Sequence, residues 1–319
     1  MTSFWQKLPQ PFLVFAPMQD VTDFVFREIV TETAKPDVLF TEFTNVDALI
    51  SKGYENAIRN FRFSKKQRPI VAQIWGTNPE NFHKVTQIVR KLKFDGVDIN
   101  MGCPDRAVVK NGAGVALIKN QKLAGEIISA VKKSAGDMAV SVKTRLGFDK
   151  IVTDEWISFL LQQKLDALII HGRIAKKMSK GFANWDEIGK IVLLKNTIDP
   201  ETIIVGNGDV KSYKQALEMH EKYKVDGVMI GRGIFSNPWV FEKTVDSKKH
   251  NKKEHLELLL KHTKMFNDAW GETKNFHIMK KFFKVYVKGF AGANELRQNL
   301  MRCESYSQVK QLVDSLLIK

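Results

Sequence analysis

Short apolar runs recur at nearly even spacing along the first 245 residues of the chain. Most of these runs are unbroken instead of alternating with polar residues, which is typical of strands buried on both faces of a parallel sheet. Eight runs are predicted to be strands, at residues 12–17, 38–43, 70–74, 96–100, 139–144, 167–171, 202–206 and 227–231.

The segments between these runs carry apolar residues at helical spacing. Asn78-Pro79 is a capping residue followed by proline at the first helical position, and Thr22 is the candidate cap of the first helix. The predicted helices are 22–33, 78–93, 121–134, 153–164, 184–195 and 212–223. Eight strand–helix units in about 240 residues predict an α/β fold, a (β/α)8 TIM barrel. A doubly wound open sheet is the alternative, but it requires a glycine-rich turn after its first strand, and Ala16-Pro17-Met18 is not one.

Strand signals stop at about residue 246. Residues 247–253 are polar and basic and are expected to form a linker, and amphipathic helices are expected at 255–270, 276–288 and 307–317. We therefore expect two domains, a barrel at residues 1–245 and an all-helical domain at residues 246–319.

A barrel places its chemistry at the carboxyl ends of its strands. The candidates there are Met18 and Gln19, Glu42 and Asn45, Gln73, Asn100 and Cys103, Lys143 and Arg145, His171 and Arg173, Asn207 and Asp209, and Arg232. The turns Asn207-Gly208-Asp209 and Gly231-Arg232-Gly233 predict a phosphate-binding place, because glycines let backbone N–H groups approach an anion and Arg232 adds a fixed charge. Simple tight turns are the alternative.

Three of these residues admit more than one role. Cys103 lies on a bend set by Pro104 just past a strand, so it is either a reactive thiol or an ordinary buried cysteine. Lys143 could form a Schiff base, balance a developing negative charge or be solvated at the rim. His171 could bind phosphate or cap its strand. We expect no metal site, because the other six histidines are scattered and the two cysteines have no Cys-x-x-Cys partners.

The formal net charge is +15, which favours a polyanionic partner unless the host proteome is simply rich in lysine. Residues 245–319 hold 15 Lys and Arg against 8 Asp and Glu, so under a quarter of the chain carries nearly half of the excess. Two cysteines imply no disulfide framework, and neither a signal peptide nor a membrane-spanning run is apparent. A monomeric, cytoplasmic protein is the expectation.

The motifs resemble those of the tRNA-dihydrouridine synthase family, from about Phe12 to Leu317. The most specific one is Asn100-Met101-Gly102-Cys103-Pro104 with its tail, Lys110 and Gly112-Ala113-Gly114. The other shared motifs are Ala16-Pro17-Met18, Gln73, Ser141-Val142-Lys143-Thr144-Arg145, His171-Gly172-Arg173, the two glycine turns, His277-Ile278-Met279-Lys280-Lys281, Lys288-Gly289-Phe290 and Glu295-Leu296-Arg297.

The resemblance implies a flavoenzyme in which NADPH reduces FMN, and FMN reduces the C5–C6 bond of specific uridines in tRNA. The FMN-binding residues that it implies are Pro17, Met18, Gln73, Asn100, Lys143, His171, Asn207, Gly208, Asp209, Gly231 and Arg232. The expected tRNA contacts are Lys110, Arg145, Arg173, Lys280, Lys281, Lys284, Lys288 and Arg297.

The chemistry of uracil reduction suits Cys103 as its catalytic residue. Hydride addition at C6 leaves a carbanion at C5 that must take up a proton. A thiol with an ordinary pKa of about 8.5 is largely protonated at neutral pH, so Cys103 is the expected general acid. The base must also leave its stack to reach a flavin at a barrel mouth.

Two other functions stay open. An FMN barrel of the dihydroorotate or dihydropyrimidine dehydrogenase type would use the same phosphate site on a free pyrimidine, but it leaves the basic helical tail unexplained. An RNA-binding barrel without chemistry is disfavoured by the presence of Cys103, Lys143 and His171.

Overall fold

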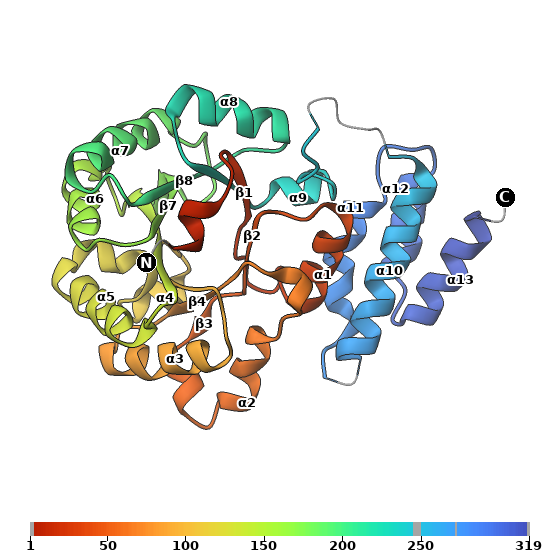
Figure 1. Ribbon diagram of the computed structural model, residues 1–319. Coiled ribbons are helices and arrows are strands. Elements are labelled where there is room, and N and C mark those ends of the chain that lie inside the picture. The colour runs from red at the N-terminus through yellow and green to blue at the C-terminus, as the bar shows by residue number, and fades with distance from the viewer. Residues whose placement is uncertain (1–2, 245–249, 272, 318–319) are drawn as a thin grey trace.

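The computed structural model describes residues 3–244, 250–271 and 273–317. Within these ranges the strands close into one parallel barrel (Figure 1). Its strands are β1 (Phe12–Phe15), β2 (Val38–Phe40), β4 (Ile70–Trp75), β5 (Gly96–Met101), β6 (Ala139–Gly147), β7 (Ala167–Ile174), β8 (Ile203–Asn207) and β9 (Gly227–Ile230). The pairings of β1 with β9 and of β2 with β4 complete the ring, and the two-residue β3 (Thr44–Asn45) extends it beside β4. The predicted TIM barrel and all its strands are confirmed.

Apolar side chains fill the inside of the barrel. Alternation along β1 places Phe12 and Val14 in the inner cluster, while Leu13 and Phe15 join the outer layer under the helices. Trp5, in the 3-10 turn η1 (Phe4–Lys7), is 1% exposed and packs on Phe12 at the amino ends of the strands. Because that end is filled by aromatic rings, polar chemistry is left to the opposite, carboxyl end.

The six predicted barrel helices are present. They are α1 (Phe24–Ala34), α3 (Pro79–Lys91), α5 (Gln121–Ala135), α6 (Thr153–Gln162), α7 (Trp185–Ile198) and α8 (Tyr213–Tyr223). The Asn78 side chain caps α3 by accepting from the Glu80 N–H at 3.0 Å. The prediction that Thr22 caps α1 is wrong, since Asp23 accepts from the Phe26 N–H at 2.9 Å. Thr22 is instead buried, and its hydroxyl accepts from the Met18 N–H at 2.9 Å, which folds the loop after β1.

Two of the eight units contain only short helical segments. After β2 come α2 (Tyr54–Ala57) and the 3-10 turns η2 (Ala48–Ile50), η3 (Ile58–Phe61) and η4 (Lys65–Gln67). After β9 comes the single turn α9 (Gly233–Ser236). The remaining short segments are α4 (Arg106–Lys110), η5 (Gly114–Lys119) and η6 (Ala175–Lys177), all on loops that come after strands. Short turns at these places leave the barrel mouth lined by backbone and loop side chains.

The C-terminal part is helical, as predicted. It contains α10 (Lys252–Trp270), η7 (Phe276–Phe282), α11 (Phe283–Tyr286), α12 (Ala293–Leu300) and α13 (Tyr306–Leu317). The single helix predicted for residues 276–288 is a 3-10 turn followed by one α-helical turn, and α12 was not predicted. The predicted boundary at 245/246, and residues 247–249 of the predicted linker, lie outside the described residues.

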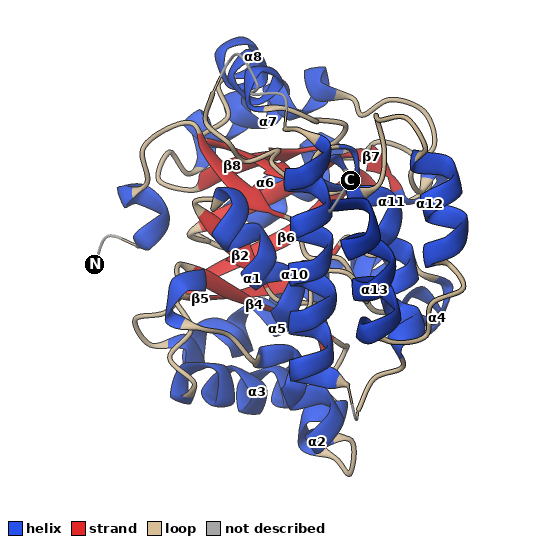
Figure 2. Ribbon diagram, turned by 90° about the vertical axis from the view of Figure 1, so that its right-hand side faces the viewer, coloured by secondary structure: helices blue, strands red, loops and turns tan. Residues whose placement is uncertain are grey.

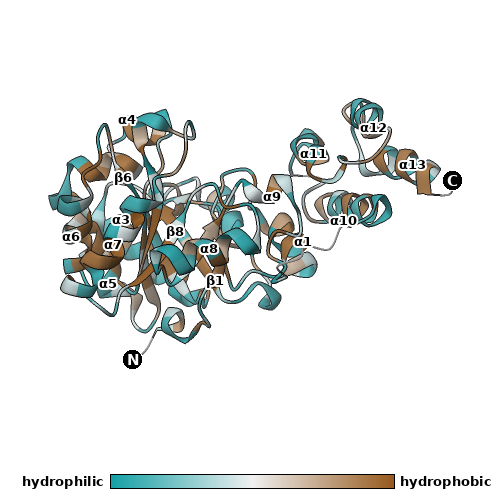
Figure 3. Ribbon diagram, turned by 90° about the horizontal axis from the view of Figure 1, so that it is seen from above, coloured by the Kyte–Doolittle hydropathy of each residue, from teal (hydrophilic) through white to brown (hydrophobic). Residues whose placement is uncertain are grey.

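These helices lie on one side of the barrel, against α1 (Figures 1 and 3). Figure 2, viewed from that side, shows α10 running across α1. Phe26 of α1 stacks on His262, with ring centroids 5.3 Å apart, and packs on Phe282 at 4.8 Å. The apolar side chains of the barrel's outer layer and those of the helical region belong to one continuous cluster. The helical region is therefore packed on the barrel as an extension of its wall, and the two-domain division stays a prediction.

Candidate active site at the barrel mouth

A cavity of about 490 Å³ opens at the carboxyl ends of the strands. It brings together Cys103 and all the residues predicted to bind the cofactor: Pro17, Met18, Gln73, Asn100, Lys143, His171, Asn207, Gly208, Asp209, Gly231 and Arg232. Arg145 and Arg173, predicted tRNA contacts, also lie in its wall. Sequence reasoning did not single out Phe43, Ser179, Lys211 and Ser236, which line it as well. Phe43 and Lys211 lie shortly after β2 and β8, so their distance from a strand end was an available signal.

The Asn100 side chain holds the loop that carries the thiol. Its Oδ1 accepts from the backbone N–H groups of Gly102, at 3.1 Å, and Cys103, at 2.9 Å. The tail of the loop packs on the other side, where the Val115 N–H donates to the Cys103 carbonyl at 3.1 Å. Gly114 has φ +59°, and a Cβ there would meet that carbonyl at 2.8 Å, so glycine is required. The asparagine and the glycine of the motif thus fix the backbone of Cys103.

A buried carboxyl group lies behind Asn100. The Asn100 Nδ2 donates to Gln73 Oε1 at 3.0 Å, and the Gln73 Nε2 donates to Asp98 Oδ2 at 2.7 Å. The Ser141 hydroxyl donates to the other Asp98 oxygen at 2.7 Å. Burial raises the pKa of Asp98 to about 7, against the opposing effects of these two hydrogen bonds and of Lys143. A chain of polar contacts therefore runs from Asp98 to the backbone of Cys103.

The environment of Cys103 favours the protonated thiol. Burial raises the pKa of the Cys103 thiol and is the largest effect. A hydrogen bond from the Asp105 backbone opposes it, as do the charges of Arg145 and Lys143, while the Asp105 carboxylate acts in the same direction as burial. A nucleophilic cysteine needs a lowered pKa, so this thiol is suited to giving a proton rather than to attacking a carbon.

Lys143 reaches into the cavity from β6. Its Nζ donates to Asn207 Oδ1 at 3.4 Å, and Asn207 is held in turn by donating to the Met229 carbonyl at 2.8 Å. Burial, and then Arg145, lower the pKa of Lys143 to about 8. The ammonium group is thus charged at neutral pH yet poorly solvated, which suits it to an anionic ligand.

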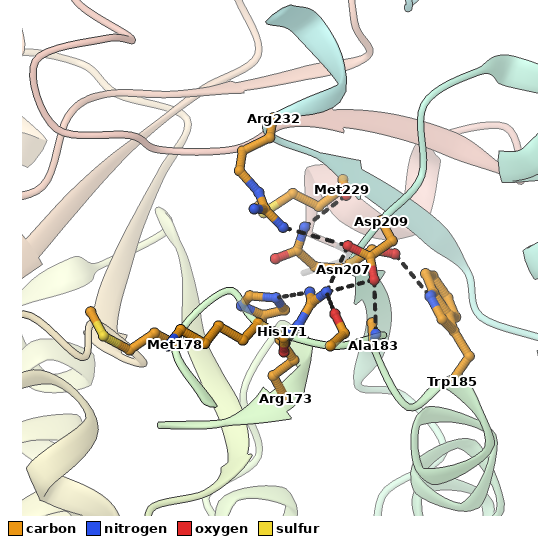
Figure 4. A network of polar contacts seen from close by, with 12 residues as sticks. His171, Arg173, Met178, Ala183, Trp185, Asn207, Asp209, Met229 and Arg232 are labelled. Atoms are coloured by element: carbon orange, nitrogen blue, oxygen red, sulfur yellow. Dashed lines mark hydrogen bonds and ion pairs between the residues drawn. The ribbon is translucent and has the colours of Figure 1, made fainter. Parts of the chain in front are cut away.

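His171 and Arg173 of β7 form a fixed cluster with Asp209 (Figure 4). The Arg173 Nη2 donates to both Asp209 oxygens, at 2.8 and 2.6 Å, and Nη1 lies 3.1 Å from His171 Nε2. Because a guanidinium group can only donate, Nε2 must accept, so the imidazole is neutral and carries its proton on Nδ1. Burial and the charges of Lys143 and Arg145 lower the pKa of His171, which agrees with this tautomer. Within the described part of the chain Nδ1 has no hydrogen-bond partner, so its N–H is available to a ligand.

The two glycine turns leave backbone donors open beside Arg232. A Cβ on Gly208 would meet the Ala183 Cβ at 2.5 Å, and one on Gly233 would meet the Val210 carbonyl at 2.7 Å, so both turns pack too closely for a side chain. The N–H groups of Arg232 and Gly233 donate to no acceptor among the described residues. The Arg232 side chain is 58% exposed and lies 3.5 Å from Asp209. This end of the cavity has the donor set that a phosphate needs.

The other predicted tRNA contacts lie outside the cavity. Lys110, Lys281 and Lys284 are exposed, whereas Lys280, Lys288 and Arg297 are partly buried. The Lys288 Nζ donates to the carbonyls of Phe235 and Ser236 at 2.7 Å each, and the Arg297 Nη1 donates to the Val287 carbonyl at 2.7 Å. In the cavity wall, the Arg145 Nε donates to the Gly102 carbonyl at 2.8 Å. Several of these cations therefore have structural partners already, and their contacts with tRNA stay predictions.

Over the described residues, no cluster of three or more acidic, histidine or cysteine side chains could hold a metal ion. In the same part of the chain no helix is both long and apolar enough to span a membrane.

Comparisons with known proteins show the family to which the chain belongs. A model of the dihydrouridine synthase family, Dus, matches residues 14–319. The probable tRNA-dihydrouridine synthase of Staphylococcus aureus strain COL is 45% identical over 315 residues, which cover 98% of this chain and 95% of that protein. The probable tRNA-dihydrouridine synthase 2 of Bacillus subtilis strain 168 is 44% identical over 315 residues, covering 98% and 96%. The solved structure of a variant of NCR from Zymomonas mobilis matches with a TM-score of 0.51 at 14% identity, over 80% of this chain and 95% of that one.

The fold and the gathered polar side chains define the class, a TIM-barrel oxidoreductase with its site at the carboxyl ends of the strands. The chain belongs to the dihydrouridine synthase family, and the match includes the helical region. The family suggested by the sequence motifs is confirmed.

Proposed function

We propose that the chain is a tRNA-dihydrouridine synthase, which reduces the C5–C6 bond of uridines in tRNA with FMN in the cavity and NADPH as the reductant. The two bacterial relatives support the activity and the tRNA substrate. One observation carries the proposal: a thiol kept protonated by burial lines the same cavity as Lys143, His171 and the open donors of the two glycine turns. We also propose that the protein is a monomer and that it acts in the cytoplasm, where tRNA is found.

The residues present fit FMN. Arg232 and the free N–H groups of Arg232 and Gly233 would bind its phosphate. Pro17 and Met18 would hold FMN through apolar contacts, and Lys143 and the His171 Nδ1–H would supply polar contacts. The open cavity at Asn100 and Cys103 would then be left for one pyrimidine. Bound FMN, once reduced by NADPH, supplies the hydride.

The protein's own part in the reaction is to deliver a proton. After hydride addition at C6 of the uracil, the electron pair at C5 takes the proton of the Cys103 thiol, and the thiolate regains a proton from solvent. Asn100 holds the backbone of that cysteine, so the sulfur is placed before the substrate arrives. The Lys143 ammonium group stabilises negative charge that develops in the site. General acid catalysis of this kind contributes roughly 10²–10⁴-fold to the rate.

The RNA must present its base unpaired or flipped, because the cavity lies at the end of the barrel. A net charge of +15 supplies the attraction for the phosphate backbone. Lys110, Lys280, Lys281, Lys284, Lys288 and Arg297 are the proposed contacts outside the cavity, and Arg145 and Arg173 those within it. The affinity for tRNA is expected to fall steeply as salt rises.

The experiment that tests this function maps dihydrouridine by mass spectrometry in tRNA from cells that lack the protein. At least one uridine position should lose the modification and regain it when the wild-type gene is restored, but not with the Cys103→Ala gene. Unchanged dihydrouridine would contradict the proposal. So would a purified protein whose reduced flavin reacts with free pyrimidines as fast as with tRNA.

A further inference from the structure

An unusual loop lies at the rim of the cavity. Residues 176–182, which we call the rim loop, are Lys-Lys-Met-Ser-Lys-Gly-Phe, with three lysines and no acidic residue. Every residue of this loop is exposed. Phe182 is 93% exposed and Met178 is 53% exposed, the first being the most exposed of the large apolar side chains in the described residues. A single exposed aromatic ring is common, so its setting must decide whether it matters.

The backbone of the rim loop is held firmly from below. Two buried arginines on neighbouring strands donate to its carbonyl groups: Arg145 to Met178 at 2.9 Å, and Arg173 to Lys180 at 3.3 Å and to Gly181 at 2.5 Å. Just past the loop, the Ala183 N–H donates to Asp209 at 2.8 Å (Figure 4). The loop is thus a fixed platform, and its lysine and aromatic side chains are left facing outward.

The platform adjoins the substrate cavity. Ser179, Gly181 and Phe182 line a second hollow of about 400 Å³ together with Lys211 and Arg232. The two hollows share five wall residues: Arg173, Ser179, Asp209, Lys211 and Arg232. The second hollow therefore opens directly beside the main cavity, so a polymer bound across the mouth of that cavity would also reach it.

The chemistry of the second hollow suits single-stranded RNA. Grooves that bind single strands combine cations that track the backbone with an aromatic face on which a base stacks. Phe182 supplies the face, and Lys211 and the loop lysines supply the cations. A stack on Phe182 needs no particular base, because every base has a π face.

We propose that the rim loop is a stacking platform for the tRNA nucleotide next to the target uridine, with that base on Phe182 and the adjoining phosphates against Lys211 and the loop lysines. The inference rests on the proposed function, since it assumes that the target base enters the main cavity. The rim loop would then bind the RNA in addition to the contacts proposed for the helical region.

The test compares Phe182→Ala and Phe182→Trp with Leu193→Ala, a control that trims another exposed apolar side chain, 68% exposed, on α7. The FMN-loaded proteins are titrated with unmodified tRNA, and their flavin reduction by NADPH is measured separately. Phe182→Ala should weaken tRNA binding by roughly tenfold, Phe182→Trp should restore it, and Leu193→Ala should leave it unchanged. Flavin reduction by NADPH should be the same in all four proteins.

Three results are decisive. Equal tRNA affinity in wild type and Phe182→Ala would overturn the platform. If Phe182→Ala changes only the rate of flavin reduction by NADPH, the platform is also overturned, and the second hollow is assigned to the dinucleotide. If the wild-type protein binds tRNA but forms no dihydrouridine, the proposed function fails instead, so the two failures are distinct.

The loop lysines are tested by the salt dependence of binding. Lys177→Ala/Lys180→Ala should reduce the slope of log affinity against log salt by about 0.7 for each lost phosphate contact. The matched control is Lys91→Ala/Lys133→Ala, which removes two lysines at or near the carboxyl ends of α3 and α5, at the opposite end of the barrel. Equal slopes in the two double variants would contradict the role of the loop lysines.

Discussion

Single residues in this site act through their neighbours. Cys103 is placed by Asn100, Asn100 by Gln73, and Gln73 by Asp98, each through one hydrogen bond of 3.0 Å or less. The end of this chain, Asp98, touches neither the thiol nor the proposed ligands. Its buried carboxyl group nonetheless decides which way the Gln73 amide points, and so how the thiol loop is held. Asp98 is therefore a positioning residue.

The raised pKa of Asp98 predicts how the free energy of unfolding changes with pH. The pKa of Asp98 rises from 3.8 to about 7 on folding, so the folded state binds a proton that the unfolded state has lost. As pH rises from about 4 to about 7, ionisation of Asp98 therefore lowers the free energy of unfolding. The total loss is about 4 kcal/mol at most, and above about pH 7 it grows no further. Asp98→Asn removes the effect. Denaturant titrations at pH 5 and pH 7.5 should show that the wild type loses more stability than Asp98→Asn between the two. Parallel losses would show that Asp98 does not titrate in this way.

At the residue scale, sequence reasoning named most residues of the candidate cavity, which lie at or just past the carboxyl ends of the strands, and missed Asp98, which lies deeper within β5. Cys103, Lys143 and His171 could be predicted because a barrel fixes which end of each strand carries chemistry. Asp98 sits within the apolar run of β5, and only its contacts with Gln73 and Ser141 reveal its role. Phe182 was also missed, since no pattern marks an exposed ring on a loop.

At the scale of elements, the helical region holds the turn α9, which begins the proposed phosphate site, through direct hydrogen bonds. Lys288 reaches back to the barrel, where its Nζ donates to the carbonyls of Phe235 and Ser236 at the end of α9. That single turn begins with Gly233, whose N–H is part of the proposed phosphate site. The link joins two elements that are 52 residues or more apart in sequence.

Removing this link should weaken FMN binding. Lys288→Met leaves two carbonyl groups without their charged donor, so α9 loses its anchor, and the FMN dissociation constant is expected to rise several-fold. Lys284→Met is the control, because Lys284 is exposed. Fluorescence titration of the apoprotein with FMN measures the difference. A Lys288→Met variant with unchanged FMN affinity but weaker tRNA binding would assign Lys288 to the RNA surface, as the sequence predicted.

Among the secondary-structure elements, the strands were predicted correctly, whereas one helix and one helix cap were not. All eight strands were predictable from their apolar runs, because a strand buried on both faces leaves a continuous pattern. Helix α12 was missed because it has only eight residues, fewer than the window over which periodicity is judged, although Ala293, Leu296 and Leu300 lie at helical spacing. Thr22 was taken as a helix cap on residue type alone, although Asp23 beside it was equally able to cap.

At the scale of the whole molecule, the outer layer of the barrel and the helical region share one apolar core, separate from the cluster inside the barrel. Phe26, His262 and Phe282 pack together between α1 and the C-terminal helices, and the side chains of both phenylalanines are nearly fully buried. The sequence predicted two regions but gave no sign that they would share a core, because contacts between distant segments leave no local pattern.

The shared core predicts that both regions unfold together. Phe282→Ala should lower the free energy of unfolding by about 3 kcal/mol, while Phe182→Ala, the same substitution at an exposed ring, should change it by less than about 0.5 kcal/mol. Near-UV and far-UV circular dichroism should report one coincident transition in the wild type. Two separated transitions would show that the helical region is an independent domain.

We propose that the Cys103 thiol gives a proton to a uracil that is reduced in the same cavity. The most direct test is a single turnover of FMN-loaded, pre-reduced protein with an unmodified tRNA transcript, with dihydrouridine measured by mass spectrometry. Cys103→Ala should bind FMN normally yet form dihydrouridine roughly 10²–10⁴-fold more slowly. Cys303→Ala, which removes the other thiol from the helical region, should react like the wild type. Near-normal dihydrouridine formation by Cys103→Ala would rule out this thiol as the proton donor.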